Sequence, residues 1–162
     1  MIADCANYFH RQPYTRWFNP LDRLLRSALG VSYYEDTASH LDLVQWATKP
    51  VWGGLDDAAH RQLLAADLPF LRRQLTAGWT VVLVNGKTVM DWVEAAGLLT
   101  WRSAVALPGP PRTRMGVADV DGVRFVGWSA NLQSQPGALS LIPALVAAVR
   151  MATEGFRAEE SA

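Results

Sequence analysis

The stretch WTVVLVNGKTVMDWVEAAG, residues 79–97, contains the clearest structural signal in the sequence. Four consecutive apolar residues, 81–84, run into an Asn85–Gly86 turn, as expected of a strand that is buried on both faces. Thr88 is predicted to cap the helix that follows, and Gly97 is predicted to end it. This strand, turn and helix together indicate a buried sheet of the parallel type, covered by helices.

The sequence before this unit predicts one helix and one strand. Asn19–Pro20 is expected to open a helix that carries a row of leucines on one face and ends at Gly30. The segment HLDLVQW, residues 40–46, alternates only in part, which is typical of a mostly buried strand.

Two further helices are predicted between this strand and residue 79. They cover residues 55–66 and 68–77, and a break near Pro69 divides them. Asp67 is the expected cap of the second helix.

The C-terminal half predicts strands first and then a helix. Residues 102–116 are expected to contain a short strand and a stiff proline loop, and residues 116–128 a hairpin that turns at Asp121–Gly122. A polar loop, residues 129–137, then leads into an amphipathic C-terminal helix. The alternation predicts an α/β fold, a three-layer α/β/α sandwich with a small, mostly parallel central sheet. We expect one domain over residues 1–155 and a polar tail over 156–162.

Composition limits the class of protein. The chain has 162 residues, half of them hydrophobic, so it is long enough to bury one substantial core. Fifteen basic and fifteen acidic residues cancel, which excludes a strongly electropositive protein but allows a local basic face. Almost all the cations are arginines, which suit two-point contacts to phosphate or carboxylate, although a bias in base composition would also enrich arginine.

Cellular setting follows from what the sequence lacks. Cys5 is the single cysteine, which excludes an internal disulfide and a cysteine-based zinc site. The longest apolar run, Ala138–Val149, is interrupted by Ser140 and Pro143 and is too short to cross a bilayer. We therefore predict a cytoplasmic protein that contacts no membrane, requires no metal or other cofactor and shows no obligate protein partner, and its oligomeric state stays open.

Polar residues are predicted at the ends of three strands. Asp42 follows the residues Ser39-His40-Leu41, Asn85–Gly86 follow the second strand, and the loop 129–137 follows the last. In open α/β sheets the ligand crevice lies at the carboxyl ends of the strands. These positions are therefore the predicted functional site.

The order HLDLVQWATKP, VVLVNGKTV and FVGWSANLQSQPGALS resembles the second, third and fourth strands of the uracil-DNA glycosylase superfamily, over residues 15–150. In that family, a loop after the last strand enters the DNA minor groove, and its leucine wedges into the base stack as the target base flips out. The resemblance implies that Leu132 is this wedge. The alternative is that Leu132 folds back into the core beneath its loop. The family's first motif, which positions the attacking water, has no counterpart in this sequence.

The resemblance also aligns Asp42 with an asparagine that reads the edge of uracil in the family. A carboxylate accepts a hydrogen bond from the exocyclic amine of cytosine and cannot donate to a uracil carbonyl. The substitution therefore favours cytosine or a modified cytosine as the substrate base. A small shift in register would place His40 in the base pocket instead, and a purely structural carboxylate is the other interpretation of Asp42.

Supporting roles follow from the same resemblance. Phe9 is a candidate to stack on the extruded base, and Asn131 and Ser129 are candidate catalytic residues that donate to the base or to a flanking phosphate. The candidate DNA contacts, besides the wedge, are Gln133, Ser134, Lys49, Arg112 and Arg114. Packing for Phe9 and a solvated surface position for each cation are the alternatives.

The predicted function is a DNA glycosylase that hydrolyses the N-glycosidic bond of a flipped pyrimidine, with DNA as its partner, in repair or in defence against modified phage DNA. The sugar would pass through an oxocarbenium-like state while hydrogen bonds stabilise the leaving base. Two alternatives stay open. One is a catalytically inactive protein of the same fold that binds DNA or a nucleotide, and the other is an unrelated α/β module for protein association.

Overall fold

A computed structural model describes residues 8–159 except 12, 47 and 76, so Cys5 lies outside the described residues. Its core is a four-stranded sheet in the order β1-β4-β3-β2. The strands are β1 (Val81–Asn85), β2 (Arg102–Leu107), β3 (Thr113–Val120) and β4 (Val123–Trp128).

The sheet is mixed, so the predicted mostly parallel arrangement is wrong. β1 pairs with β4 in parallel, whereas β4 with β3 and β3 with β2 pair antiparallel. The antiparallel pairing of β3 with β4 follows from the tight turn at Asp121–Gly122, which is confirmed: φ is 50° at Asp121 and 76° at Gly122. A two-residue turn can join only antiparallel strands.

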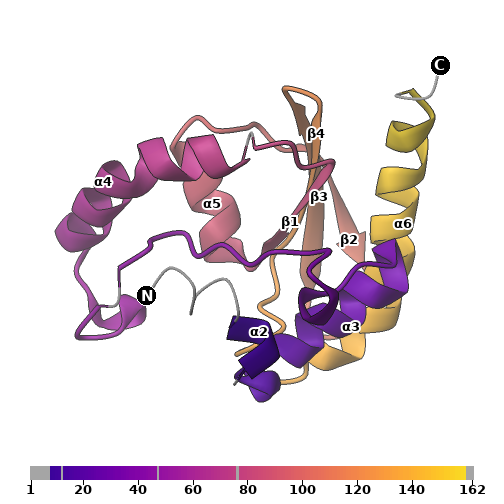
Figure 1. Ribbon diagram of the computed structural model, residues 1–162, viewed down its shortest axis with the longest axis horizontal. Helices are drawn as coiled ribbons and strands as arrows, with labels where there is room; N and C mark the ends of the chain where they lie inside the picture. The colour runs from indigo at the N-terminus through magenta and orange to yellow at the C-terminus, as the bar shows by residue number, and fades with distance from the viewer. Residues whose placement is uncertain (1–7, 12, 47, 76, 160–162) are drawn as a thin grey trace.

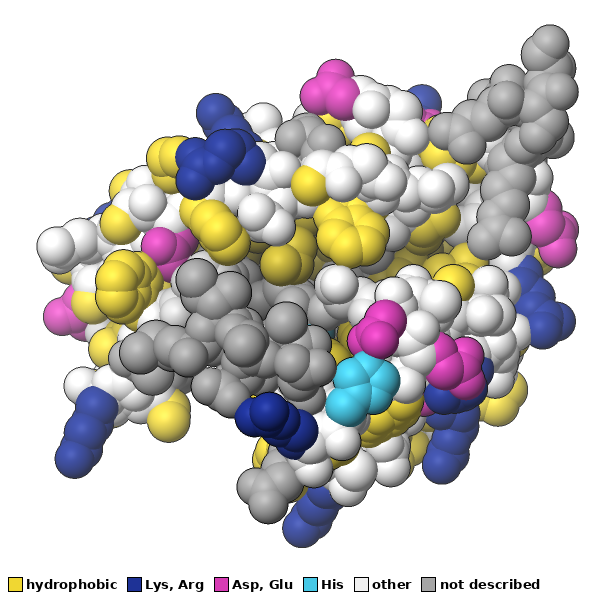
Figure 2. All heavy atoms as spheres, viewed as in Figure 1, with side chains coloured by type: hydrophobic (Ala, Val, Ile, Leu, Met, Phe, Trp, Pro, Cys, Tyr) yellow, Lys and Arg dark blue, Asp and Glu magenta, His cyan; other side chains and the backbone are white. Residues whose placement is uncertain are grey.

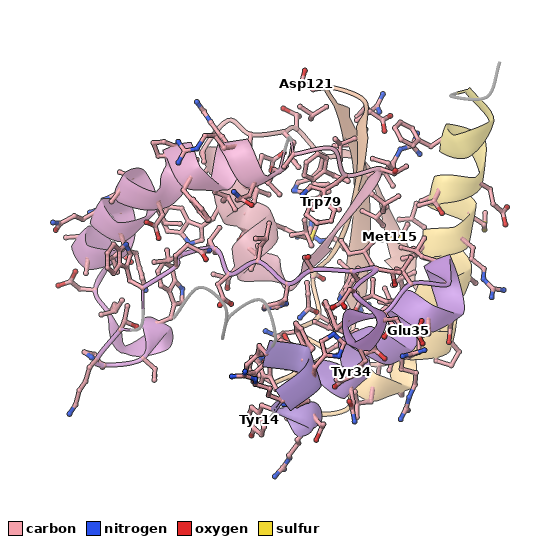
Figure 3. All side chains as sticks on the ribbon, viewed as in Figure 1. Tyr14, Tyr34, Glu35, Trp79, Met115 and Asp121 are labelled. Atoms are coloured by element: carbon pink, nitrogen blue, oxygen red, sulfur yellow. The ribbon has the colours of Figure 1, made fainter. Side chains whose placement is uncertain are left out.

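Helices cover both faces of the sheet, as the three-layer prediction requires. Figure 1 shows α3 (Thr15–Leu29) and α6 (Ile142–Glu159) on one face, and α4 (Asp57–Leu75) and α5 (Lys87–Ala95) on the other. Each face has its own apolar core. Figure 3 shows Met115 on the α6 side and Trp79 on the side of α4 and α5. The fold class is therefore α/β. The short elements are α2 (Tyr8–Arg11), η1 (Tyr33–Glu35), η2 (Trp52–Gly54) and η3 (Ala138–Leu141).

Three predicted helix boundaries are wrong, although Gly30 and Gly97 do follow helices with left-handed φ values of 71° and 66°. α3 begins at Thr15 and contains Pro20, and α4 continues through Pro69 without the predicted break. α5 is preceded by Gly86 as its N-cap residue, so Thr88 is not the cap. Burial of an apolar face outweighs the single backbone hydrogen bond that each proline removes.

Residues 37–46 and 48 form an irregular connector between η1 and η2, so the strand predicted at 40–46 is absent. Asp67, predicted as a helix cap, instead lies buried in α4 and binds this connector. Its carboxylate accepts from the backbone N–H of Gln45 (2.6 Å) and from Nε1 of Trp46 (3.0 Å). These bonds hold the connector against α4 rather than in the sheet.

The start of the connector is fixed by a buried carboxylate in α3. Oδ1 of Asp22 accepts from Oγ of Ser32 (2.7 Å) and from the backbone N–H of Tyr33 (3.0 Å). Its other oxygen accepts from Nε of Arg26 (2.8 Å). Because the buried charge is fully hydrogen-bonded, it links α3 firmly to η1.

The domain extends beyond the boundary predicted at residue 155. α6 runs to Glu159, and Phe156 is buried with the guanidinium of Arg124 over its ring, 4.8 Å from the ring centre. The predicted start of the polar tail is therefore too early.

Candidate functional site

A cavity of about 710 Å³ runs along β1. Its walls come from β1 itself, the connector, α3, α4, α5 and the loop after β4. Figure 2 shows apolar side chains gathered in a band across this side of the molecule. One end of the cavity reaches the carboxyl ends of β1 and β4, where the sequence predicts the site.

Asn85 organises this end of the cavity. Its Oδ1 accepts from Nε1 of Trp128 (2.9 Å) and from the backbone N–H of Leu132 (3.1 Å). Its Nδ2 donates to Oε1 of Gln133 (3.0 Å). The last residue of β1 thus fixes the loop after β4 against the sheet.

Asn131 presents a donor at the same end. Its Oδ1 accepts from the backbone N–H groups of Gln133 (2.9 Å) and Ser134 (3.2 Å), which folds the loop into a compact turn. Its Nδ2 donates to no acceptor within the described part of the chain, and Asn131 lines the cavity. Glycine suits position 86, before α5, because its φ of 101° is a backbone conformation that residues with a side chain rarely adopt.

His40 and Asp42 line the cavity from the connector. Nε2 of His40 lies 3.3 Å from Oδ1 of Asp42, and the imidazole ring meets Phe18 and Tyr33 edge-on. The His40 side chain is 23% exposed and that of Asp42 is 75% exposed, so the carboxylate lies at the mouth. The hydrogen bond from His40 lowers the pKa of Asp42 below its ordinary value, against the opposing effect of partial burial. Asp42 is therefore an ionised hydrogen-bond acceptor at neutral pH.

Aromatic side chains complete the lining. Trp17, Trp46 and Trp52 all line the cavity. Trp17 and Trp46 also expose part of their surface to solvent, and the backbone carbonyl of Trp17 accepts from Nε2 of Gln133 (3.2 Å). Flat apolar surfaces of this kind suit a planar ligand.

The predicted wedge is wrong. Leu132 is only 2% exposed and belongs to the core between α3, α6 and the sheet. A wedge must project from the surface to enter DNA. The polar side chains around Leu132 bond one another and the backbone, which leaves its apolar side chain to pack inward.

Phe9 and Ser129 also lie away from the cavity. Phe9 stacks on Tyr33, with ring centres 4.9 Å apart and planes 9° apart, and does not line the cavity. Ser129 extends the pairing of β3 with β4: its Oγ accepts from the backbone N–H of Arg114, and its own N–H donates to the Arg114 carbonyl. Neither residue therefore lies among the side chains that line the cavity, and their stacking and catalytic roles stay predictions.

The structure brings together only part of the predicted site. Asp42, His40, Asn131 and Gln133 line one cavity. The remaining predicted contacts, Ser134, Lys49, Arg112 and Arg114, are exposed and outside its lining.

Sequence reasoning placed Asn85 at a strand end but did not find its role in holding the loop. Its position directly after an apolar strand was the available signal. The cavity-lining Trp17 was missed altogether, because an aromatic residue in a helix carries no signal that separates a ligand contact from packing.

The comparisons add no relative: no family model, curated protein or solved structure matches the chain. Within the described residues, no three His, Cys, Asp or Glu side chains come together as a metal ion requires. None of the helices in this part of the chain combines the length and apolarity needed to span a bilayer.

Proposed function

We propose that the cavity binds a pyrimidine base of the cytosine type, as a nucleotide or as an unpaired base in DNA. The observation that carries the proposal is that one cavity is lined both by an ionised acceptor, Asp42, and by the amide of Asn131, whose Nδ2 has no acceptor among the described residues. Cytosine presents an amine that donates and a ring carbonyl that accepts. Uracil has a carbonyl oxygen where cytosine has this amine, so it would place an acceptor against the carboxylate.

Size and aromatic lining support the same proposal. The volume of 710 Å³ lies within the range of about 300–1,000 Å³ that is typical of small-molecule sites. Trp17 and Trp46 offer faces on which a base would stack. Stacking on an aromatic side chain depends little on which base is bound, so the hydrogen bonds would select cytosine.

Cleavage of the N-glycosidic bond is the second candidate, and the resemblance to uracil-DNA glycosylases favours it. In that reaction the bond between the sugar C1′ and the base nitrogen breaks, the oxygen of a water molecule bonds to C1′, and the base leaves as an anion that takes up a proton. Asn131 would stabilise the anion by donating to its carbonyl. The lowered pKa of Asp42 suits base recognition better than proton abstraction, because a weak base activates water poorly. We therefore place binding first.

Titration calorimetry with cytidine and uridine tests the proposal. We expect cytidine to bind and Asp42→Asn to weaken it about tenfold or more, the loss expected when a charged hydrogen bond is removed. Asp121→Asn is the matched control. It makes the same change of carboxylate to amide at the hairpin tip (Figure 3), and Asp121 does not line the cavity. Equal affinities for the two nucleosides, or no binding of either, would contradict base recognition by Asp42.

Oligonucleotides that carry uracil, cytosine or 5-hydroxymethylcytosine, followed by alkali treatment, decide whether the base is also removed. Strand breaks confined to the cytosine-type substrates support glycosylase activity. Salt-sensitive binding of the same oligonucleotides without breaks supports a non-cleaving DNA-binding protein.

A further inference from the structure

Within the described part of the chain, β1 forms an edge of the sheet, because β4 is the one strand that pairs with it there. The backbone N–H of Arg124 in β4 donates to the carbonyl oxygen of Thr80 (3.0 Å), so the even-numbered residues of this stretch bond to β4. Backbone groups of successive residues in a strand point to opposite sides. The N–H and C=O groups of Val81, Leu83 and Asn85 therefore point away from β4, and we call these groups the outer edge of β1.

The outer edge has no hydrogen-bond partner in the described part of the chain. Among residues 8–159 that the structure describes, no backbone or side-chain group forms a hydrogen bond with the N–H or C=O groups of Val81, Leu83 or Asn85. Every residue from 78 to 85 lines the cavity. Unpaired strand edges bind additional strands unless charge, proline or a covering segment prevents it, and β1 carries neither charge nor proline.

The cavity opens onto both apolar cores at once. Leu21 and Leu25, from the core under α3 and α6, line it, and so do Leu71, Leu75 and Phe125 from the core under α4 and α5. A ligand between both layers lies in the plane of the sheet. An extended chain fits such a position, since its side chains alternate between the two faces and its backbone satisfies the unpaired groups.

We propose that the outer edge of β1 binds an extended, apolar segment of another polypeptide, about five residues long, as a fifth strand of the sheet. A length of five residues matches β1 itself. A second copy of this chain fits less well, because residues of the connector, α4 and α5 line the same cavity as β1 and would obstruct the approach of a second sheet. The inference does not rest on base binding, because it uses the backbone groups of β1 and neither Asp42 nor Asn131.

Two matched peptides test the proposal. The probe is a fluorescent peptide with the sequence Lys-Lys-Val-Ile-Val-Leu-Val-Lys-Lys, and its control is the same peptide N-methylated at three alternate residues of the apolar stretch. Methylation keeps the side chains but removes backbone donors. We expect the probe to bind by fluorescence anisotropy and the control to bind about tenfold or more weakly. Equal binding of both would show a merely apolar groove, and no binding of the probe would overturn the proposal.

Amide hydrogen exchange by NMR locates the contact. The probe should slow exchange at Val81, Leu83 and Asn85 and leave Val82, which already bonds to β4, unchanged. Protection of these three amides without peptide, increasing with protein concentration, would mean that a second copy covers the edge and would overturn the proposal. Val81→Pro removes one outward donor at the first strand residue, where proline is tolerated, and should weaken binding of the probe several-fold. If this variant fails to fold, the two peptides on the unmodified protein still decide the question.

Discussion

Leu132→Ala separates a core leucine from a DNA-contacting one. The side chain is 2% exposed and packs among the residues between α3, α6 and the sheet. Truncating a fully buried leucine costs about 2–5 kcal/mol, from lost apolar burial and the cavity left behind. We expect a loss of about 3 kcal/mol in the free energy of unfolding, which lowers the melting temperature by roughly 6–12 °C in a chain of this size.

Urea denaturation followed by tryptophan fluorescence measures this loss. Leu139→Ala is the matched control: Leu139 follows the same loop but is 52% exposed, so its truncation should change stability by less than about 0.5 kcal/mol. The burial argument for Leu132 fails if its alanine variant is as stable as this control. In that case the side chain would be free to project outward, and the wedge hypothesis would return.

Three further variants test individual contacts. Gly127→Ala should cost about 1–3 kcal/mol in the free energy of unfolding, because the new Cβ would lie 2.7 Å from Cη2 of Trp101. Asp67→Ala should cost about 1–3 kcal/mol in the free energy of unfolding, because the backbone N–H of Gln45 and Nε1 of Trp46 lose their acceptor. The rate of amide hydrogen exchange in the connector should rise. In His40→Phe, NMR titration should show the pKa of Asp42 rising towards its ordinary value of 3.8. The pKa of Asp42 is lower in the folded than in the unfolded chain, because His40 stabilises the ionised carboxylate. The interaction therefore stabilises the fold above pH 3.8, the ordinary pKa, and this stabilisation is lost as the pH falls through the folded-state pKa.

Each of these predictions has a clear contrary result. Gly53→Ala is the control for the glycine variant, since its Cβ would meet no atom within 4 Å, and equal stability of the two variants would refute the clash. Unchanged amide exchange at Gln45 and Trp46 would show that Asp67 does not hold the connector. An Asp42 pKa that does not respond to loss of His40 would mean that another cause depresses it.

The sequence by itself determined the parts of the fold that depend on local chemistry. The strand 81–85, the hairpin at Asp121–Gly122 and the glycines after α3 and α5 were all predictable. Apolar runs, positive φ values and turn residues act within a few positions of one another, so their signals are present in the sequence.

Tertiary packing decided the rest. Leu132 is buried because the sheet and two helices surround it, and the loop sequence alone could not distinguish this burial from exposure. Asp67 binds the connector because α4 continues past Pro69, which local rules predict as a break. The cavity also depends on segments from across the chain: the connector stays outside the sheet, and no described strand pairs with the outer edge of β1. Which partner a side chain or strand edge finds depends on residues distant in sequence, and only the folded chain brings them together.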